Sequence, residues 1–164
     1  MKHQMIIAAV LSTALLAPVA PAAAAPAEVV VTEAWVKASE YSDHVGGMTG
    51  VFMKITNKTK KAIYLVGGSS SIAPMVETHQ VVGGMMSKKE GGIRIWPGKT
   101  VTLQAGGLHI MLMGLKKAIL PGSKVDLTLK FTGAKNLVLK PMLAKISASG
   151  QETYTPAPMP SVTK

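Results

Sequence analysis

Apolar and polar residues alternate along most of this chain, in short stretches that turn residues separate. The run at 125–131, Val-Asp-Leu-Thr-Leu-Lys-Phe, is the clearest case, because every second residue is apolar. Alternation with a period of two is typical of a β-strand that buries one face and leaves the other in solvent. The pattern predicts strands at 28–37, 48–56, 62–66, 74–80, 92–96, 100–104, 108–113, 124–131 and 136–146.

Helical periodicity is nearly absent, so the chain is expected to form an all-β domain. Eight or nine short strands joined by glycine turns are typical of an antiparallel sandwich or a Greek-key barrel. The Gly-Gly-Met-Met segment at 83–86 follows a predicted strand and is interpreted as a glycine-rich connection.

The two ends of the chain differ in composition from the part with strands. Residues 1–24 combine Lys2, an apolar stretch and a run of alanines, which is typical of a secretory signal peptide. Because the apolar stretch is too short for a membrane span, we expect an exported protein without stable membrane insertion. Residues 25–150 then form one domain, and the proline-rich segment 151–164 is expected to be a flexible tail.

The chain is strongly basic, with 18 Lys and Arg against 8 Asp and Glu and a formal net charge of +10. Removal of Lys2 with the signal peptide lowers this charge to +9. The lysines stand singly or in pairs with few aromatic neighbours, which argues against nucleic-acid binding. We interpret the charge as a soluble basic surface, with docking onto an acidic partner or an anionic membrane surface as the alternative.

The 164 residues contain no cysteine, which excludes disulfides, thiolate zinc sites and thiol redox chemistry. Methionine sulfur forms no disulfides and needs no deprotonation, yet it offers the soft donor that Cu(I) prefers. The acidic residues are scattered, and neither a Ser-His-Asp order nor a phosphate-binding glycine loop appears, so an enzyme is not expected.

His109 and Met111 are the strongest candidate metal ligands. In a strand at 108–113, His109, Met111 and Met113 share one face, and the aliphatic residues between them share the other. An imidazole nitrogen and a thioether sulfur side by side suit a soft, monovalent copper ion. The alternative is a histidine satisfied at a strand end, beside methionines that only fill space.

A second cluster of the same residue types lies upstream. His79 ends a predicted strand, and Met85 and Met86 follow it in the glycine-rich connection. Two adjacent methionines between polar residues gain little from burial, although a hydrophobic plug over the end of the sandwich is the alternative. Because a sandwich brings separate segments together at one end of its sheets, both clusters could surround one ion. His44 has no such methionine and is interpreted as a solvated loop residue.

Several stretches of the chain resemble the periplasmic copper chaperone family of the PCu(A)C type. Residues 106–116 read Gly-Gly-Leu-His-Ile-Met-Leu-Met-Gly-Leu-Lys, almost the complete hallmark of that family. The resemblance continues at Ala34-Trp35, at 51–57, at 77–79 and at 127–131, so it covers nearly all of the chain after the signal peptide.

The resemblance implies a cupredoxin-like β-sandwich that holds one Cu(I) through two histidines and two methionines. The ligands would be His79, His109, Met111 and one of the pair Met85 and Met86. Family members usually place about ten residues between the first histidine and its methionine, whereas five or six intervene here. Strand parity favours Met85, proximity to the usual position favours Met86, and we choose Met85.

By the same resemblance, the protein would be a periplasmic monomer that carries copper without catalysing a reaction. Its acceptor would be the binuclear copper centre of cytochrome c oxidase or a thioredoxin-like copper chaperone. Two other functions stay open. One is a periplasmic copper buffer that serves resistance, and the other is a metal-free structural sandwich.

Overall fold

The computed structural model describes residues 28–146, so the signal peptide predicted at 1–24 and the tail predicted at 151–164 lie outside the described residues. All regular structure in this part of the chain is strand, and no helix in it is long and apolar enough to cross a bilayer. The strands are β1 (Val29–Ala38), β2 (Met48–Asn57), β3 (Ile63–Ser69), β4 (Met75–Val82), β5 (Met85–Lys88), β6 (Ile93–Ile95), β7 (Thr100–Leu103), β8 (His109–Met113), β9 (Lys124–Thr132) and β10 (Leu137–Ile146).

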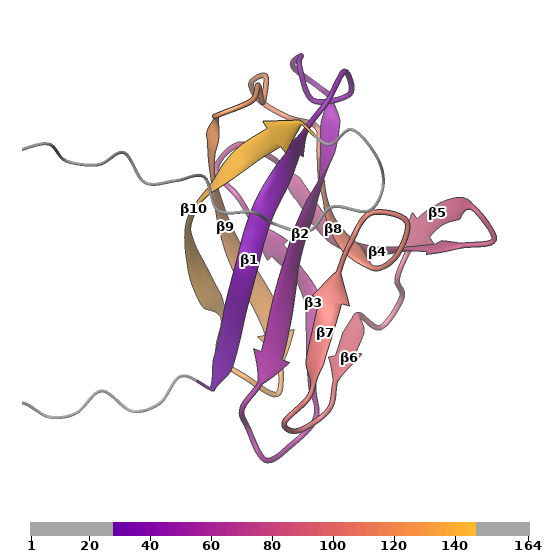
Figure 1. Ribbon diagram of the computed structural model, residues 1–164, viewed down its shortest axis with the longest axis vertical. Coiled ribbons are helices and arrows are strands. Elements are labelled where there is room, and N and C mark those ends of the chain that lie inside the picture. The colour runs from indigo at the N-terminus through magenta and orange to yellow at the C-terminus, as the bar shows by residue number, and fades with distance from the viewer. Residues whose placement is uncertain (1–27, 147–164) are drawn as a thin grey trace, which may run out of the picture.

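The strands form the two layers of a β-sandwich (Figure 1). One layer has the order β5-β4-β8-β2-β1, with β7 also paired to β2, and the other has the order β10-β9-β3-β6. The strand β10 joins the layers, because its first part pairs with β9 and its end pairs with β1. The predicted all-β sandwich is confirmed, with one difference in detail. The pair β1 and β10 is parallel, so the strands are not antiparallel throughout.

The core lies between the layers and consists of the apolar residues that the alternation predicted. On β9, Val125, Leu127 and Leu129 are at most 1% exposed, while the residues between them face outward. On β8, Ile110 and Leu112 are fully buried against the same core. This inner packing fixes the position of β8, and through it the position of the residues on its opposite face.

The interpretation of 83–86 as a connection is wrong, because Met85 begins a short strand. Gly83 and Gly84 have φ angles of 58° and 79°, in the left-handed region that glycine adopts without steric cost. Two such residues in succession form the tight turn of a β-hairpin, and β5 therefore folds back along β4. The hairpin projects from the side of the sandwich (Figure 1).

Candidate metal centre

The two candidate histidines lie next to each other on the outer face of the first layer. His79 on β4 is directly opposite His109 on β8, and the centroids of their rings are 5.8 Å apart. The sequence predicted that the two segments would meet at one end of the sandwich. Instead they are paired strands of one sheet, and the histidines project away from the core, since the alternate residues Thr78 and Ile110 face inward.

Although they face outward, His109 and Met111 are only 3% and 5% exposed. The ring of Phe52 on β2 lies beside His109 of the neighbouring strand β8, with ring centroids 6.3 Å apart. A Cβ atom at Gly50, two residues away on the same strand, would come within 2.8 Å of the Phe52 ring, so glycine at this position leaves room for the ring. The outer face therefore has a second, local apolar environment.

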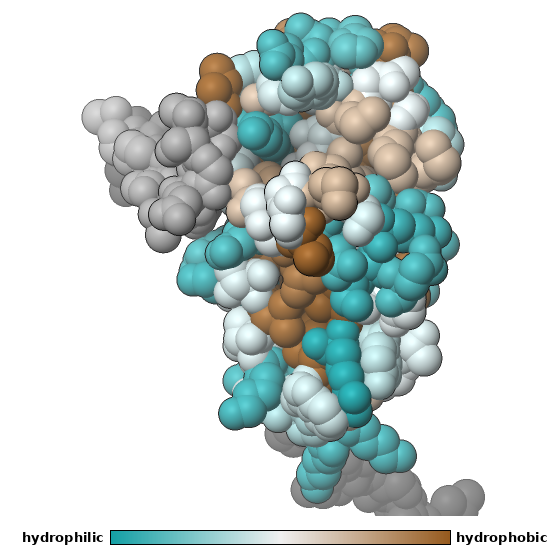
Figure 2. Space-filling view, turned by 90° about the vertical axis from the view of Figure 1, so that its right-hand side faces the viewer, coloured by the Kyte–Doolittle hydropathy of each residue, from teal (hydrophilic) through white to brown (hydrophobic). Residues whose placement is uncertain are grey.

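A cavity of about 370 Å³ opens beside His109. Its walls come from β2, β8, β5, the loop before β8, and the end of β1 with the loop that follows it, and their exposed surface is almost entirely apolar. Residues of moderate hydropathy surround a hollow in the upper half of the face shown in Figure 2. The imidazole thus borders a largely apolar space that is open to solvent on one side.

Each histidine has one ring nitrogen in contact with the protein and one that is free. The Nδ1 atom of His109 lies 2.9 Å from the carbonyl oxygen of Gly107, so it carries the proton and donates it. The Nε2 atom of His79 lies 3.4 Å from a carboxylate oxygen of Glu77. The other nitrogens, Nε2 of His109 and Nδ1 of His79, are buried and have no hydrogen-bond partner.

Among the described residues, these two nitrogens are the only buried side-chain nitrogen or oxygen atoms without a partner. A buried polar atom left unpaired costs about 1–3 kcal/mol, and native proteins retain few of them. Metal-binding histidines characteristically donate their second nitrogen to a carbonyl or carboxylate, which fixes the tautomer and leaves a lone pair for the metal. The arrangement at His79 and His109 matches this description.

The charges near the site are balanced. Lys88 Nζ lies 3.0 Å from Glu77, and their hydrogen bond lowers the pKa of the Glu77 carboxyl below its ordinary value. Glu77 therefore stays ionised between a lysine and an imidazole. Burial lowers the pKa of His109 below that of a free histidine, so its ring is neutral at neutral pH and available as a ligand.

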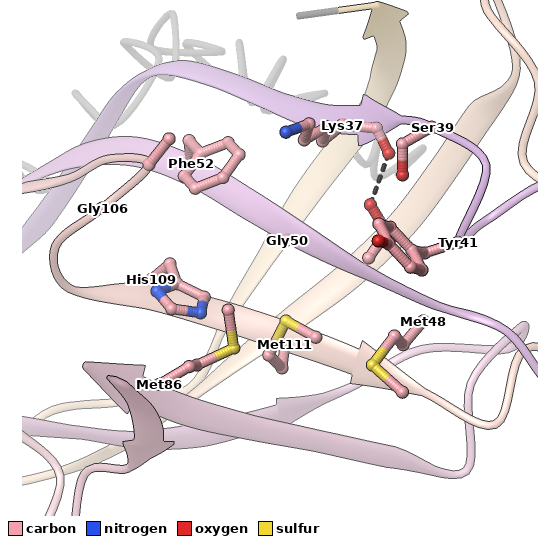
Figure 3. Close-up of a pocket in the computed structure, with 12 residues that line it drawn as sticks. Lys37, Ser39, Tyr41, Met48, Gly50, Phe52, Met86, Gly106, His109 and Met111 are labelled. Carbon is pink, nitrogen blue, oxygen red and sulfur yellow. Dashed lines mark hydrogen bonds between the residues drawn. The ribbon is translucent and has the colours of Figure 1, made fainter. Parts of the chain in front are cut away.

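The structure distinguishes between the two methionines of the hairpin. Met86 pairs with Val81, two residues from His79, and so lies on the face that carries the histidines. It lines the cavity with His109 and Met111, and Figure 3 shows its sulfur between these two side chains. Met85 pairs with Val82, belongs to the opposite face and is 76% exposed.

The structure thus brings together four of the five candidates, His79, Met86, His109 and Met111, and leaves Met85 apart. His44 lies in the loop after β1, where its ring is 2.8 Å from Asp43 and 60% exposed, and it does not line the cavity. Sequence reasoning missed Phe52 and Met48, which also line the cavity. Met48 and Phe52 lie on the same face of a predicted strand as Gly50, but nothing in the sequence indicated that other residues cover this face.

The donor types restrict the metal. No group of three or more His, Cys, Asp and Glu residues that could hold an ion occurs within residues 28–146. Besides His109, the cavity is lined by the thioethers of Met86 and Met111, which are the side chains placed to supply further soft donors. Thioether and imidazole donors select soft ions such as Cu(I), whereas carboxylate and carbonyl oxygens suit magnesium and calcium.

Comparison with solved structures places this fold among the PCuAC domains. The copper-bound PCuAC domain of PmoF2 superposes with a TM-score of 0.60 at 20% identity, over 75% of this chain and 97% of that domain. The Cu(I) form of DR1885 from Deinococcus radiodurans gives a TM-score of 0.56 at 29% identity, over 79% of this chain and 85% of that protein. The cupredoxin-like sandwich predicted from the sequence is consistent with both likenesses.

Residues 29–141 match the family described as "Putative lipoprotein LpqE-like", and the chain belongs to this LpqE-like family. A relative in Leifsonia xyli subsp. xyli, "Putative lipoprotein Lxx21020", is 37% identical over 131 residues, which cover 77% of this chain and 75% of the relative.

Proposed function

We propose that this protein is an exported copper carrier that binds one Cu(I) through His79, His109, Met111 and Met86. The observation that carries the proposal is the pair of buried, unpartnered imidazole nitrogens on opposed residues of β4 and β8. Two thioethers beside these nitrogens complete a set of four soft or borderline donors without charge. The Cu(I) form of the similar protein DR1885 supports the oxidation state.

The composition of the site suits transport better than permanent storage. A site without thiolate binds Cu(I) less strongly than a thiolate-rich acceptor, so transfer to such an acceptor is favourable. The opening of the cavity beside His109 gives an acceptor access to the metal. By resemblance, the acceptor is the binuclear copper centre of cytochrome c oxidase or a thioredoxin-like copper chaperone.

Export is part of the same proposal. The relative in Leifsonia is described as a lipoprotein, a class of protein exported or anchored at a membrane. The signal-like composition of residues 1–24 agrees with this, and the periplasm is the compartment in which we expect the protein to act.

X-ray absorption of the Cu(I)-loaded protein tests the ligand set. We expect Met86→Leu to lose one sulfur scatterer and to bind Cu(I) more weakly. Loss of a residue that only orients a ligand weakens metal binding by roughly 10- to 100-fold, so loss of the ligand itself should cost at least this much. Met85→Leu is the matched control, since it changes the adjacent methionine on the opposite face. An unchanged sulfur shell in Met86→Leu would remove this residue from the proposed site.

Delivery is tested separately by mixing the Cu(I)-loaded protein with a reduced dithiol acceptor domain of an oxidase and following the metal. Quantitative transfer supports a carrier. Retention of copper by this protein, together with copper sensitivity and normal oxidase assembly in a deletion strain, would instead identify a buffer.

A further inference from the structure

Three methionines form a row across the outer face, beyond the histidines and near the end of the sheet. Met113 on β8 is directly opposite Met48 on β2 and also directly opposite Met75 on β4. Residues directly opposite each other in antiparallel strands have Cβ atoms about 4.5–5.5 Å apart and project to the same side. The three thioether groups therefore occupy one continuous strip of surface.

Core packing does not explain this row. Met48 and Met75 are 46% and 51% exposed, and Met113 is partly buried. Their neighbours on the inner face, such as Leu112 and Val76, supply the aliphatic packing. Of the eight methionines among the described residues, only Met53 and Met142 belong to the hydrophobic core cluster. Four of the eight, Met48, Met75, Met85 and Met86, are instead exposed on the surface.

The chemistry of the row is that of a soft-metal site. Three thioethers can coordinate a soft monovalent ion without losing a proton and without a charged ligand. The methionine side chain has three rotatable bonds, so the sulfurs of the outer two residues can reach over the middle one. The nearest carboxylate along β4 is Glu77, and it is already paired with Lys88.

We infer that Met48, Met75 and Met113 form a second binding site for a soft monovalent ion, Cu(I) or its analogue Ag(I). This site is separate from the proposed imidazole site and does not depend on it. Met111 lies between the two sites, because it is two residues from both His109 and Met113 on the same face of β8. Residues two apart on a strand are about 7 Å from each other, so Met111 links the two sites.

The cavity supports the same connection. Met48 lines it together with Met111, Met86 and His109, and Figure 3 shows these four side chains in succession along one wall. An ion held by the exposed row therefore lies at the rim of the cavity that leads to the imidazoles. The row would capture ions from solvent, or receive them on the way to an acceptor.

Titration of the full chain with Ag(I), followed through the methyl signals of ¹³C-methionine by NMR, tests this inference. We expect two successive equivalents in the wild-type protein, the second of which shifts the methyl signals of Met48, Met75 and Met113. Met75→Leu should lose the second equivalent and keep the first. Met85→Leu, which changes an exposed methionine outside the row, should keep both.

The double variant His79→Ala with His109→Ala separates the two proposals. It should lose the tighter equivalent while the signals of the row still shift with added Ag(I). Absence of a second equivalent in the wild-type protein, or its persistence in Met75→Leu, would overturn the three-methionine site and leave the proposed carrier function standing. Loss of both equivalents in the double variant would overturn the independence of the row.

Discussion

The two faces of β8 carry residues of different chemistry on the same five-residue strand. The inward residues Ile110 and Leu112 are fully buried in the core between the layers. The outward residues His109 and Met111 are almost as well buried, but they line an open cavity together with Phe52. Burial alone therefore does not identify a core residue. The inner face stabilises the fold, and the outer face presents donors.

Substitutions on the two faces of β8 should affect different properties, stability on the inner face and Cu(I) affinity on the outer face. These are the largest effects that we expect. Leu112→Ala should lower the free energy of unfolding by about 2–5 kcal/mol, because it leaves a cavity in the core, while the folded fraction still binds Cu(I). Met111→Leu should change stability by less than about 1.5 kcal/mol, yet weaken Cu(I) binding markedly.

Denaturant unfolding and competition with a Cu(I) chelator measure the two quantities on each variant. If Met111→Leu destabilises the protein as much as Leu112→Ala and binds copper normally, the distinction between the two faces fails.

A smaller effect is expected one step away from the donors, at Glu77. Replacement of Glu77 by Gln removes the charge that favours a proton on Nε2 of His79, and it leaves Lys88 unpaired near the metal. We expect a loss of about 10-fold in Cu(I) affinity, with the sulfur ligands unchanged. The ¹⁵N chemical shifts of the His79 ring should show a change in tautomer. Lys88→Gln controls for loss of the ion pair alone, and an equal loss in both variants would assign the effect to the ion pair.

The smallest effect concerns the pH dependence of the metal-free protein. Burial lowers the pKa of His109 in the folded state, so below about pH 6.5 the unfolded chain binds a proton that the folded protein does not. Stability should therefore fall modestly as the pH decreases from about 7 to about 5, a range in which most carboxylates remain ionised. His109→Gln should flatten this slope in thermal unfolding experiments. A slope unchanged by the substitution would show that His109 does not titrate in this way.

The alternation of residues was sufficient to predict nine of the ten strands within a few residues, because each of these strands buries one face. The strand β5 was missed because all four of its residues are exposed, so burial imposes no pattern on them. The signal that could have found it is Gly83-Gly84 itself, since two glycines between apolar pairs favour a hairpin turn.

The same turn explains the choice between the hairpin methionines. Every second residue onward from His79 leads to Met85, but residues two apart share a face only along one uninterrupted strand. A two-residue turn pairs Val82 with Met85 and Val81 with Met86, so the parity is reversed beyond it. The sequence also could not indicate which outward face was covered, because that depends on the ring of Phe52 on β2 lying beside His109 on the neighbouring strand β8.

The position of Met86 on the outermost strand of its sheet has a kinetic consequence. Three of the proposed donors project from β4 and β8, whose pairing with each other is held by the core, whereas the fourth is carried by a peripheral hairpin. Peripheral segments separate from a fold at a lower free-energy cost than central ones. Dissociation of the ion would then begin at this one sulfur, and its residence time would depend more on how firmly the hairpin stays folded than on the strength of four bonds.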